Sequence, residues 1–253
     1  MTQMQVPQDK DRRIKTAMVL AAGLGVRMRP ITDRLPKPLV PVLGTPMLET
    51  IIARLKAAEV ASIVVNAFYL KEQIRDFIGA KNDPGLSLSE EDVLLETGGG
   101  VALALPRLGQ KPFIVVNGDV CWLEGAEPAF ERLMAAWNPE IMDALLLLHP
   151  TCRAVGYEGS GDFSMEPSGR LVRRQELQQA PFVFAGIQIL HPKLFDKVPA
   201  GAFSLNLIYD RALENDRLYG LRHEGEWFHV GTPEGLVEVE ERLKDRSNPS
   251  DFF

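Results

Sequence analysis

Residues 18–43 of this 253-residue chain read MVLAAGLGVRMRPITDRLPKPLVPVL. A short apolar run ends at Gly23, Gly25 follows, and Arg27 and Lys37 come next, with a proline on either side of the lysine. An apolar run that stops at a glycine predicts a buried strand. Glycines after a strand let the backbone approach a ligand closely, and successive N–H groups can cradle an anion. The stretch therefore predicts a phosphate site beyond the end of a strand, where open α/β sheets bind their ligands.

Two common phosphate-binding loops do not fit this stretch. GLGVRM nearly matches the dinucleotide fingerprint G-x-G-x-x-G, but Met28 stands at the third glycine. The prolines between residues 30 and 41 also exclude the long helix that would carry a pyrophosphate. A P-loop would need Gly-Lys-Ser/Thr at the start of a helix. A long loop that carries Arg27 and Lys37 instead suits a triphosphate held beside a second phosphate, because arginine grips two oxygens while lysine acts as a movable point charge.

Strands and helices alternate along the first 150 residues. Strands are predicted at 16–22, 61–67, 92–96, 112–119 and 142–149. Helices are predicted at 44–60, with Thr45 as its cap and Pro46 in its first position, and at 70–79, 99–108 and 128–137. The alternation predicts an α/β fold, a three-layer domain around a mainly parallel central sheet.

The rhythm changes after residue 155. A hairpin is predicted at 161–174, turning at PSG, and strands are predicted at 182–190, 217–225 and 226–230, with helices at 204–215 and 232–246. The predicted organisation has a flexible arm at 1–15, a single domain at 16–245 and a tail at 246–253. The domain divides into a nucleotide-binding half, 16–150, and a sugar-phosphate-binding half, 151–245.

The composition is that of an ordinary soluble globular chain, with 45% hydrophobic and 25% charged residues. A net charge of -6 argues against nucleic-acid binding. No segment approaches the roughly 18 apolar residues of a membrane span, and the polar first 15 residues do not resemble a signal peptide. Cys121 and Cys152 are expected to be reduced thiols. We expect a cytoplasmic monomer or homodimer.

Six motifs together resemble a known family, the sugar-1-phosphate nucleotidyltransferases. The G-x-G-x-R run with a downstream Pro-Lys-Pro, at residues 20–42, is its signature. The others follow in the family's order: ETGGG (96–100), NGD (117–119), GDF (161–163), FAGIQILHP (184–192) and WFHVGTPE (227–234). The resemblance covers residues 16–245 and is greatest to enzymes that use UTP and N-acetylmuramate 1-phosphate in cell-wall sugar recycling. It implies a Rossmann-like domain of the GT-A type.

The resemblance implies a reaction and its catalytic residues. A sugar phosphate oxygen would attack the α-phosphorus of a nucleoside triphosphate and release pyrophosphate, which requires alignment and charge neutralisation rather than a covalent nucleophile. Arg27 would bind the leaving phosphates, Lys37 would hold the α-phosphate against the sugar phosphate, and Asp119 would bind Mg²⁺, with Mn²⁺ as an alternative.

The resemblance also implies two binding sets. The nucleotide-binding set is Ala22, Gly23, Gly25, Val26, Arg27, Lys37, Glu96, Thr97, Gly98 and Asn117. The sugar-phosphate-binding set is Gly161, Asp162, Arg173, Arg174 and Gly186. Ordinary structural interpretations remain open for several of these residues: a glycine-rich helix start at 96–100, a strand-ending turn at 117–119 and the start of a hairpin at 161–162.

The chain departs from the family pattern at two places. His229 stands where relatives carry an aspartate that binds metal. Three roles are open for it: a metal ligand, a phosphate contact as imidazolium, or no direct role, with Asp119 and the substrates holding Mg²⁺ alone. Glu176-Leu177 replaces a Glu-Lys pair, so Arg173 or Arg174 would supply the missing cation and could meet the lactyl carboxylate of a muramic acid.

The sequence thus predicts a uridylyltransferase that makes UDP-N-acetylmuramate or a related UDP-sugar. One alternative keeps the chemistry with other substrates, as in a mannose-1-phosphate guanylyltransferase or a glucose-1-phosphate thymidylyl- or uridylyltransferase. Another alternative, suggested by His229, is a sugar-nucleotide sensor without catalysis.

Overall fold

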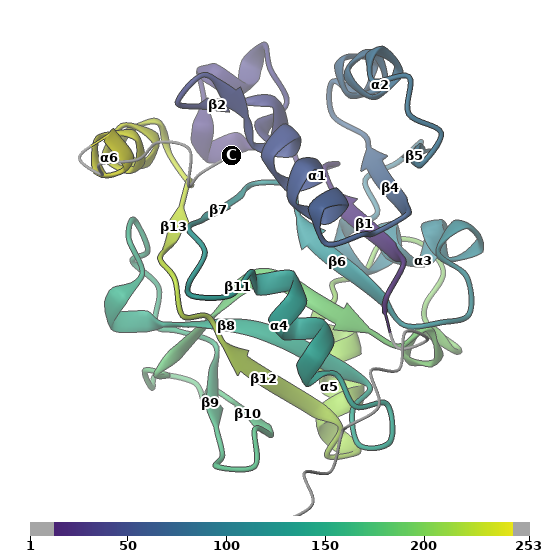
Figure 1. Ribbon diagram of the computed structural model, residues 1–253, viewed down its shortest axis with the longest axis vertical. Helices are drawn as coiled ribbons and strands as arrows, with labels where there is room; N and C mark the ends of the chain where they lie inside the picture. The colour runs from purple at the N-terminus through teal and green to yellow at the C-terminus, as the bar shows by residue number, and fades with distance from the viewer. Residues whose placement is uncertain (1–12, 245–253) are drawn as a thin grey trace, which may run out of the picture.

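The computed structural model describes residues 13–244, so most of the predicted arm and all of the predicted tail lie outside the described residues. Within residues 13–244, a nine-stranded sheet forms the centre of the molecule (Figure 1). Its main path runs β10-β9-β11-β6-β1-β4-β5, with β8 paired to β11 and β12 paired to β8. The strands are β1 (Thr16–Leu20), β4 (Ser62–Ala67), β5 (Leu86–Glu90), β6 (Phe113–Asn117), β8 (Ala144–Pro150), β9 (Phe163–Met165), β10 (Leu171–Arg173), β11 (Phe182–Leu190) and β12 (Leu218–Arg222).

The strands β1, β4, β5 and β6 of the central sheet are parallel, as predicted. β1 lies between β4 and β6 and is parallel to both, and β5 continues the parallel order at the edge. β11 is antiparallel to both β6 and β8, which makes the sheet mixed. The carboxyl ends of β1, β4 and β6 therefore lie together at one end of the sheet, and the loops that follow these strands lie there too.

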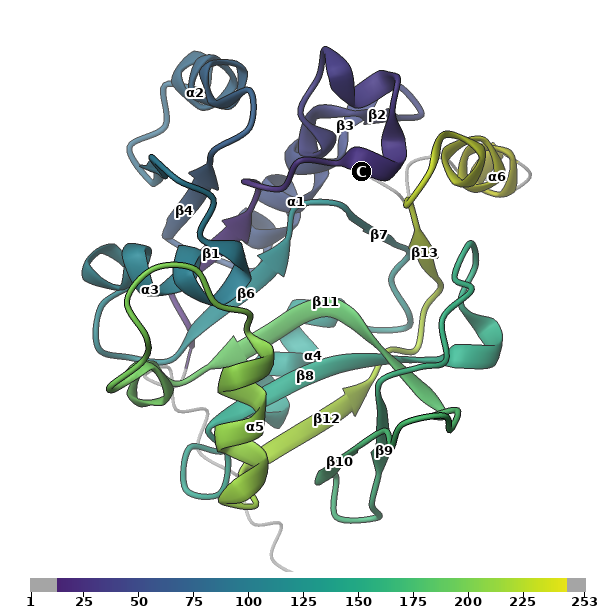
Figure 2. The same cartoon turned by 180° about the vertical axis from the view of Figure 1, so that it is seen from behind.

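Helices cover both faces of this sheet, which gives the predicted three layers (Figures 1 and 2). One core holds the apolar sides of α1, α2 and α4, and a second core on the opposite face holds those of α3 and α5. Neighbouring residues of β6 alternate between the two cores, Ile114 and Val116 in the first and Phe113 and Val115 in the second. Burial on both faces explains why the central strands are almost continuously apolar. The helices are α1 (Met47–Ala57), α2 (Lys71–Ala80), α3 (Glu96–Leu108), α4 (Ala129–Ala136), α5 (Asn206–Glu214) and α6 (Pro233–Lys244).

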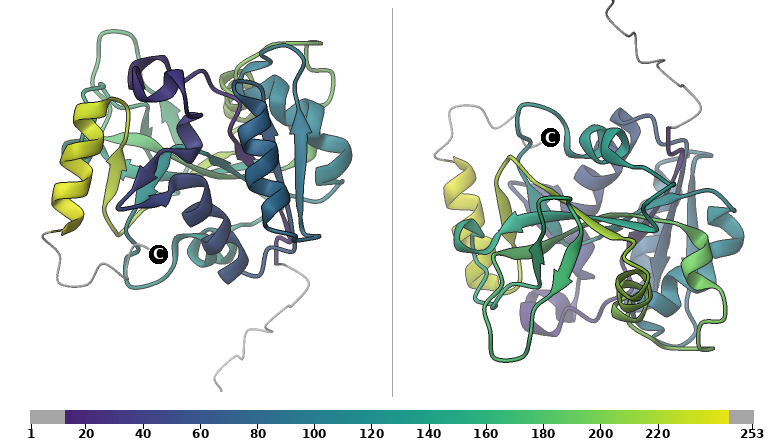
Figure 3. Two further views of the ribbon diagram at one scale, coloured as in Figure 1. Left: turned by 90° about the horizontal axis from the view of Figure 1, so that it is seen from above. Right: turned by 90° about the horizontal axis from the view of Figure 1, so that it is seen from below.

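A second, two-stranded sheet extends from the same end of the central sheet. The chain continues past β6 into β7 (Val120–Trp122), which pairs antiparallel with β13 (Trp227–His229). In this register His229 lies opposite Val120, the residue after Asp119. α6 lies beside β13 (Figure 3) and joins it in a third apolar cluster with the loop after β1. The sequence did not predict β7, yet its pairing brings residues of the two halves of the chain together.

Two further predictions of element bounds are wrong. The strand predicted at 92–96 lies at Leu86–Glu90 instead, directly after a turn in which the Gly85 N–H donates to Asp83 Oδ1 at 2.8 Å. Thr45 does not cap a helix. Thr45 and Pro46 form a short strand, β3, which pairs with β2 (Pro41–Val42) in a hairpin. α1 begins only at Met47, so Pro46 precedes the helix and is not in its first position.

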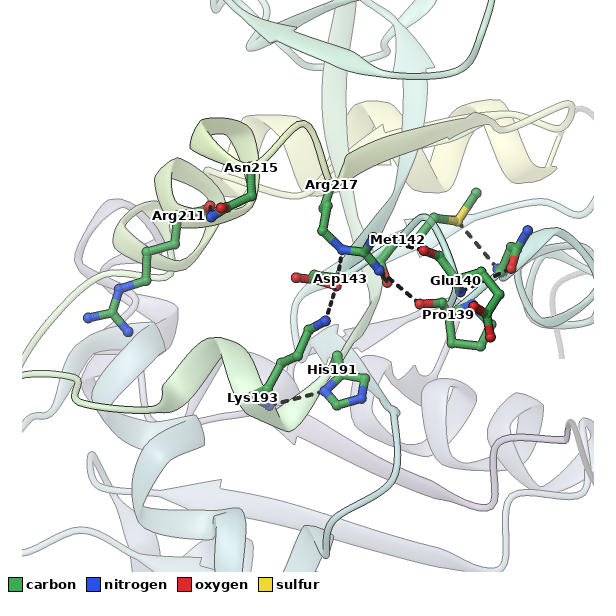
Figure 4. A network of polar contacts seen from close by, with 10 residues as sticks. Pro139, Glu140, Met142, Asp143, His191, Lys193, Arg211, Asn215 and Arg217 are labelled. Carbon is green, nitrogen blue, oxygen red and sulfur yellow. Dashed lines mark hydrogen bonds and ion pairs between the residues drawn. The ribbon is translucent and has the colours of Figure 1, made fainter.

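A cluster of charged residues holds the opposite end of the sheet (Figure 4). Ala144 at the start of β8 pairs with Leu190, and Leu190 pairs with Phe113 at the start of β6, so Asp143, which directly precedes β8, lies at the end of the sheet where both strands begin. Asp143 Oδ1 accepts from Arg217 Nε at 2.5 Å and pairs with Lys193 Nζ at 2.7 Å. Arg217 also donates to the carbonyl oxygens of Pro139, Glu140 and Met142.

No helix among residues 13–244 is both long enough and apolar enough to cross a membrane.

Candidate active site

A cavity of about 360 Å³ lies at the edge where the parallel strands end. The residues that line it include almost all of the predicted nucleotide-binding set and all of the predicted catalytic set: Ala22, Gly23, Gly25, Val26, Arg27, Lys37, Glu96, Thr97, Asn117 and Asp119. The sequence did not single out the other lining residues, Leu20, Met28, Pro38, Asn66, Leu94 and Gly231. The motifs at 20–42, 96–100 and 117–119 thus meet at one place.

The loop after β1 folds back on itself through short 3-10 turns, η2 (Val26–Met28), η3 (Ile31–Asp33) and η4 (Lys37–Leu39). Gly25 has φ of +62° and contacts the returning chain closely. A Cβ atom at Gly25 would lie 2.9 Å from Thr32 Cγ2 and 3.2 Å from Lys37 Cβ. The Thr32 hydroxyl donates to the Gly25 carbonyl oxygen at 2.8 Å and fixes this contact. Glycine is therefore needed at position 25 both for its backbone conformation and for the approach of Lys37.

Lys37 and Asp119 form an ion pair in the cavity. Lys37 Nζ lies 2.6 Å from Asp119 Oδ2, with the lysine side chain 10% exposed and the aspartate side chain 38% exposed. Asp119 follows β6 in a turn that the Gly118 N–H anchors to the Leu20 carbonyl oxygen at 2.8 Å. The buried stem of Lys37 fixes its ammonium, while the Asp119 carboxylate remains accessible from the cavity.

His229 lies next to this pair and is held by aromatic rings. Its ring centroid is 5.9 Å from that of Trp227 and 6.0 Å, edge-on, from that of Tyr157. Burial lowers the pKa of His229, the cations Lys37 and Arg27 lower it further, and Asp119 opposes them. These effects favour a neutral imidazole near neutral pH.

The residues present fit a divalent ion only together with a phosphate ligand. Among the described residues, no group of three or more His, Cys, Asp or Glu side chains gathers as a metal site. Mg²⁺ is commonly bound by one or two carboxylates plus substrate phosphate oxygens, and the accessible Asp119 carboxylate fits that pattern.

The motif at 96–100 divides between the cavity and the core. Glu96 and Thr97 line the cavity, and the Thr97 hydroxyl accepts a hydrogen bond from the Leu205 N–H at 2.9 Å. Gly98 is buried against Phe203, whose carbonyl oxygen accepts the Gly98 N–H at 2.8 Å. A Cβ atom at Gly98 would lie 2.4 Å from the Phe203 ring, so packing alone requires this glycine.

The predicted sugar-phosphate residues lie around the hairpin and are bonded largely to the protein itself. The Asp162 carboxylate accepts the Phe184 N–H at 2.8 Å. Arg174 donates to the carbonyl oxygens of Gly161, Gln175 and Gln178. Arg173 pairs with Asp210 at 2.7 Å.

Gly186, the last of this set, lies in β11 where the register against β8 shifts. Its φ is +78°, and a Cβ atom there would lie 2.4 Å from Val120 Cγ1. Gly186 therefore lets β11 pass close to the chain that carries Asn117 and Asp119.

Asn66 is a cavity residue that sequence reasoning missed. It lies near the end of β4, is 2% exposed, and its Oδ1 accepts the Ala21 N–H at 2.7 Å. A signal for it was present, because IVVN occurs at both 63–66 and 114–117, and each asparagine lies at or next to the end of an apolar strand.

Comparisons with known proteins agree with this geometry. A family model described as nucleotidyl transferase matches residues 16–246. The chain is 39% identical to N-acetylmuramate alpha-1-phosphate uridylyltransferase of Caulobacter vibrioides over 236 residues, which cover 91% of this chain and 98% of that protein. It is 38% identical to the protein of the same name from Neisseria meningitidis serogroup B, over 88% of this chain and 96% of the relative.

A solved structure shares the fold. The putative glucose-1-phosphate thymidylyltransferase of Bacillus anthracis superposes with a TM-score of 0.75 over 94% of this chain and 98% of that chain. At 19% identity this likeness concerns the fold alone. The predicted three-layer domain with a mainly parallel mixed sheet is confirmed.

Proposed function

Since the chain belongs to the nucleotidyl transferase family, whose model spans residues 16–246, we propose that it transfers a uridylyl group from UTP to N-acetylmuramate 1-phosphate. The products are UDP-N-acetylmuramate and pyrophosphate. The choice of UTP and of this sugar rests on the two relatives at 39% and 38% identity. The assignment of the chemistry to this cavity rests on one observation: the glycine loop, Arg27, Lys37 and Asp119 line the same cavity at the strand ends.

Positioning and charge carry the proposed reaction. The backbone of Gly23 and Gly25 and the Arg27 side chain bind the β- and γ-phosphates, which leave as pyrophosphate. An ammonium group has three donors, so Lys37 can hold Asp119 and still donate to the α-phosphate and the sugar phosphate. The reaction needs the attacking oxygen in line with the leaving group, and fixing two phosphates beside one lysine supplies that alignment.

Asp119 is the residue we assign to Mg²⁺. The ion would neutralise charge on the phosphate oxygens when bound there. His229 is not part of this assignment, because its ring packs against Trp227 and Tyr157 and is not among the residues that line the cavity. A Cβ atom at Gly231 would lie 2.5 Å from His229 Nε2, so this nitrogen faces the turn after β13.

Binding of the sugar phosphate by Arg173 or Arg174 stays a prediction, and the contacts of both side chains count against it. Arg173 and Arg174 were candidates for the lactyl carboxylate of the sugar. Arg174 already donates to three carbonyl oxygens and Arg173 is paired with Asp210, so binding the sugar through either would require these contacts to rearrange. Arg27 and Lys37 are the cations in the cavity lining and serve the phosphates in this proposal.

Release of pyrophosphate tests the proposed function. The assay crosses UTP, GTP and dTTP with the 1-phosphates of N-acetylmuramate, mannose, glucose and N-acetylglucosamine in the presence of Mg²⁺. Release with UTP and N-acetylmuramate 1-phosphate alone is the expected result. Release with another pair would keep the chemistry and replace the substrates.

If the natural chain releases no pyrophosphate with any pair of substrates, the sensor alternative is favoured. That alternative predicts UTP binding without pyrophosphate release by the natural chain, with turnover appearing in His229→Asp. If both the natural chain and this variant bind UTP without turnover, the assignment of catalysis to this cavity is wrong.

A further inference from the structure

Glu91 is a buried carboxylate that the proposed reaction does not use. Its side chain is 0% exposed, and it follows β5 directly. Its backbone N–H donates to the Ala67 carbonyl oxygen at 2.9 Å, which ties the end of β5 to the end of β4. A buried carboxylate is costly unless its oxygens are hydrogen-bonded, so the partners of Glu91 indicate what it is for.

Both carboxylate oxygens of Glu91 accept hydrogen bonds from groups that lead to the cavity. Oε1 accepts from Asn66 Nδ2 at 2.6 Å, and Oε2 accepts from the Leu95 N–H at 3.1 Å. Asn66 Oδ1 in turn accepts from the Ala21 N–H at 2.7 Å. Ala21 precedes the glycine loop, and Leu95 precedes Glu96 and Thr97. One side chain is therefore hydrogen-bonded, through Asn66 and directly, to the residues that precede two segments of the cavity lining, the glycine loop and the start of α3.

The close packing around this chain of hydrogen bonds involves the third glycine of ETGGG. A Cβ atom at Gly100 would lie 2.8 Å from Asn66 Nδ2 and 2.8 Å from Glu91 Oε1. The first turns of α3 therefore cover the Glu91–Asn66 contact and shield it from water.

Each hydrogen bond in this series has a fixed donor and a fixed acceptor. That order is maintained only if both terminal atoms of the side chain at position 91 accept. Because the Glu91 carboxylate only accepts, Asn66 must turn its NH₂ toward it and its oxygen toward the Ala21 N–H. A glutamine at position 91 would place its own NH₂ against either Leu95 N–H or Asn66 NH₂. Flipping Asn66 would only move the donor–donor conflict to Ala21. A buried group left in such a conflict loses its hydrogen bond.

We propose that Glu91 is a positioning residue for nucleotide binding, which acts through Asn66 on Ala21 and directly on Leu95. This inference rests on the proposed function, because the ligand whose site it organises is the nucleoside triphosphate. Glu91 itself has no exposed surface and makes no contact with the ligand in this assignment.

Four proteins test the inference: the natural chain, Glu91→Gln, Asn66→Asp and the double variant Glu91→Gln/Asn66→Asp. The dissociation constant of UTP with MgCl₂ is measured by calorimetry, and hydrogen exchange is followed in the peptides that contain Ala21 and Leu95. We expect Glu91→Gln to weaken UTP binding by about 10- to 100-fold and to speed exchange in both peptides. Electrostatics predicts the opposite for affinity, because the variant removes a negative charge near an anionic ligand.

The double variant restores the direction of the hydrogen bonds. The new carboxylate at position 66 accepts from Ala21 and from the glutamine NH₂, while the glutamine oxygen accepts from Leu95. We expect it to recover most of the lost affinity and the slow exchange, although its negative charge lies closer to the cavity. Asn66→Asp alone places two carboxylates face to face and is expected to bind UTP as weakly as Glu91→Gln.

Asp143→Asn is the matched control, since it alters another buried carboxylate at the far end of the sheet. It is expected to lower the melting temperature and to leave UTP affinity within about twofold of the natural chain. Unchanged UTP affinity in Glu91→Gln would overturn this inference alone. So would an equal loss of affinity in Asp143→Asn, or a double variant that recovers neither readout. A natural chain that binds none of UTP, GTP and dTTP would instead overturn the proposed function, and this inference with it.

Discussion

The molecule carries a charged cluster at each end of its central sheet, and the two clusters differ in how far their hydrogen bonds are satisfied. At the end of the sheet where β6 and β8 begin, Asp143 has a side chain that is 9% exposed and pairs with both Lys193 and Arg217 (Figure 4). At the carboxyl end of β6, Asp119 is 38% exposed and pairs with Lys37 inside a cavity.

The difference lies in the donors. Arg217 uses its guanidinium on Asp143 and on the carbonyl oxygens of Pro139, Glu140 and Met142, so the protein itself takes up four of its five N–H donors. Lys37 gives Asp119 one hydrogen bond, its ammonium has two further donors, and it lines a cavity of about 360 Å³. A cluster whose donors are filled stabilises the fold, whereas one with donors left over can bind phosphate.

Removing Lys37 gives the largest expected effect. Lys37→Met keeps the buried stem and removes the ammonium, so kcat/KM for pyrophosphate release is expected to fall by about 10²–10³-fold. The melting temperature is expected to stay close to that of the natural chain, because the pair is open to the cavity. Steady-state kinetics and thermal unfolding check both values. A fall of less than threefold would remove Lys37 from the phosphate site and break the comparison at its functional end.

Weakening Asp143 should show the reverse pattern. Asp143→Asn leaves two cations without their carboxylate, and the partial exposure of Lys193 and Arg217 moderates the cost. The free energy of unfolding is expected to fall by about 1–3 kcal/mol with kcat/KM within twofold of the natural chain. Denaturant unfolding measures the first quantity. A loss of activity without a loss of stability would show that the far cluster is coupled to the site.

Two buried histidines outside the cavity are expected to make the stability of the protein depend on pH. His149 and His223 lie with ring centroids 6.2 Å apart, and burial lowers the pKa of each to about 4. The unfolded chain, with an ordinary pKa near 6.5, binds more protons below that pH. The contribution of these two histidines to the free energy of unfolding is therefore fully present above about pH 6.5 and is lost as the pH falls toward 4.

A single substitution isolates this contribution. His223→Gln keeps a donor for the Leu123 carbonyl oxygen, which His223 Nε2 contacts at 3.0 Å, and removes one titrating group. The loss of unfolding free energy between pH 6.5 and pH 4.5 is expected to shrink by about 1–2 kcal/mol. Parallel pH curves for the variant and the natural chain would show that His223 does not titrate across folding.

Sequence reasoning recovered the parts of the molecule that local pattern determines. The central strands are apolar runs because both of their faces are buried, and they end at glycine or asparagine where the ligand edge begins. Gly23, Gly25 and Arg27 follow such a strand within a few residues, so the cavity wall that they form could be predicted. Lys37 could be assigned to a phosphate from the same stretch, whereas its role at the α-phosphate came from the family resemblance.

The remaining parts depend on contacts between distant segments. β7 has only three residues, too short for a periodic pattern, and its pairing with β13, the strand predicted at 226–230, brings His229 beside Asp119. β5 reads LSLSE, in which serines weaken the apolar signal, so the strand was predicted six residues too late. Glu91 looks like one acid in a polar run, and its burial follows only from α3 packing over it.

Substitution of His229 is expected to have the smallest effect, although the family pattern places a metal ligand at this position. Its position suggests a metal ligand by family pattern, whereas its ring packs against Trp227 and Tyr157 and is not among the residues that line the cavity. With Mg²⁺ assigned to Asp119 and the phosphates, His229→Asn is expected to lower kcat by less than about threefold and to leave the Mg²⁺ concentration for half-maximal rate unchanged.

Mg²⁺ titrations of pyrophosphate release compare the two proteins, with Asp119→Asn as the positive control, for which that concentration should rise by at least about tenfold. A rise of similar size in His229→Asn would make the histidine a ligand. The open end of the sheet would then bind metal through two protein side chains rather than one.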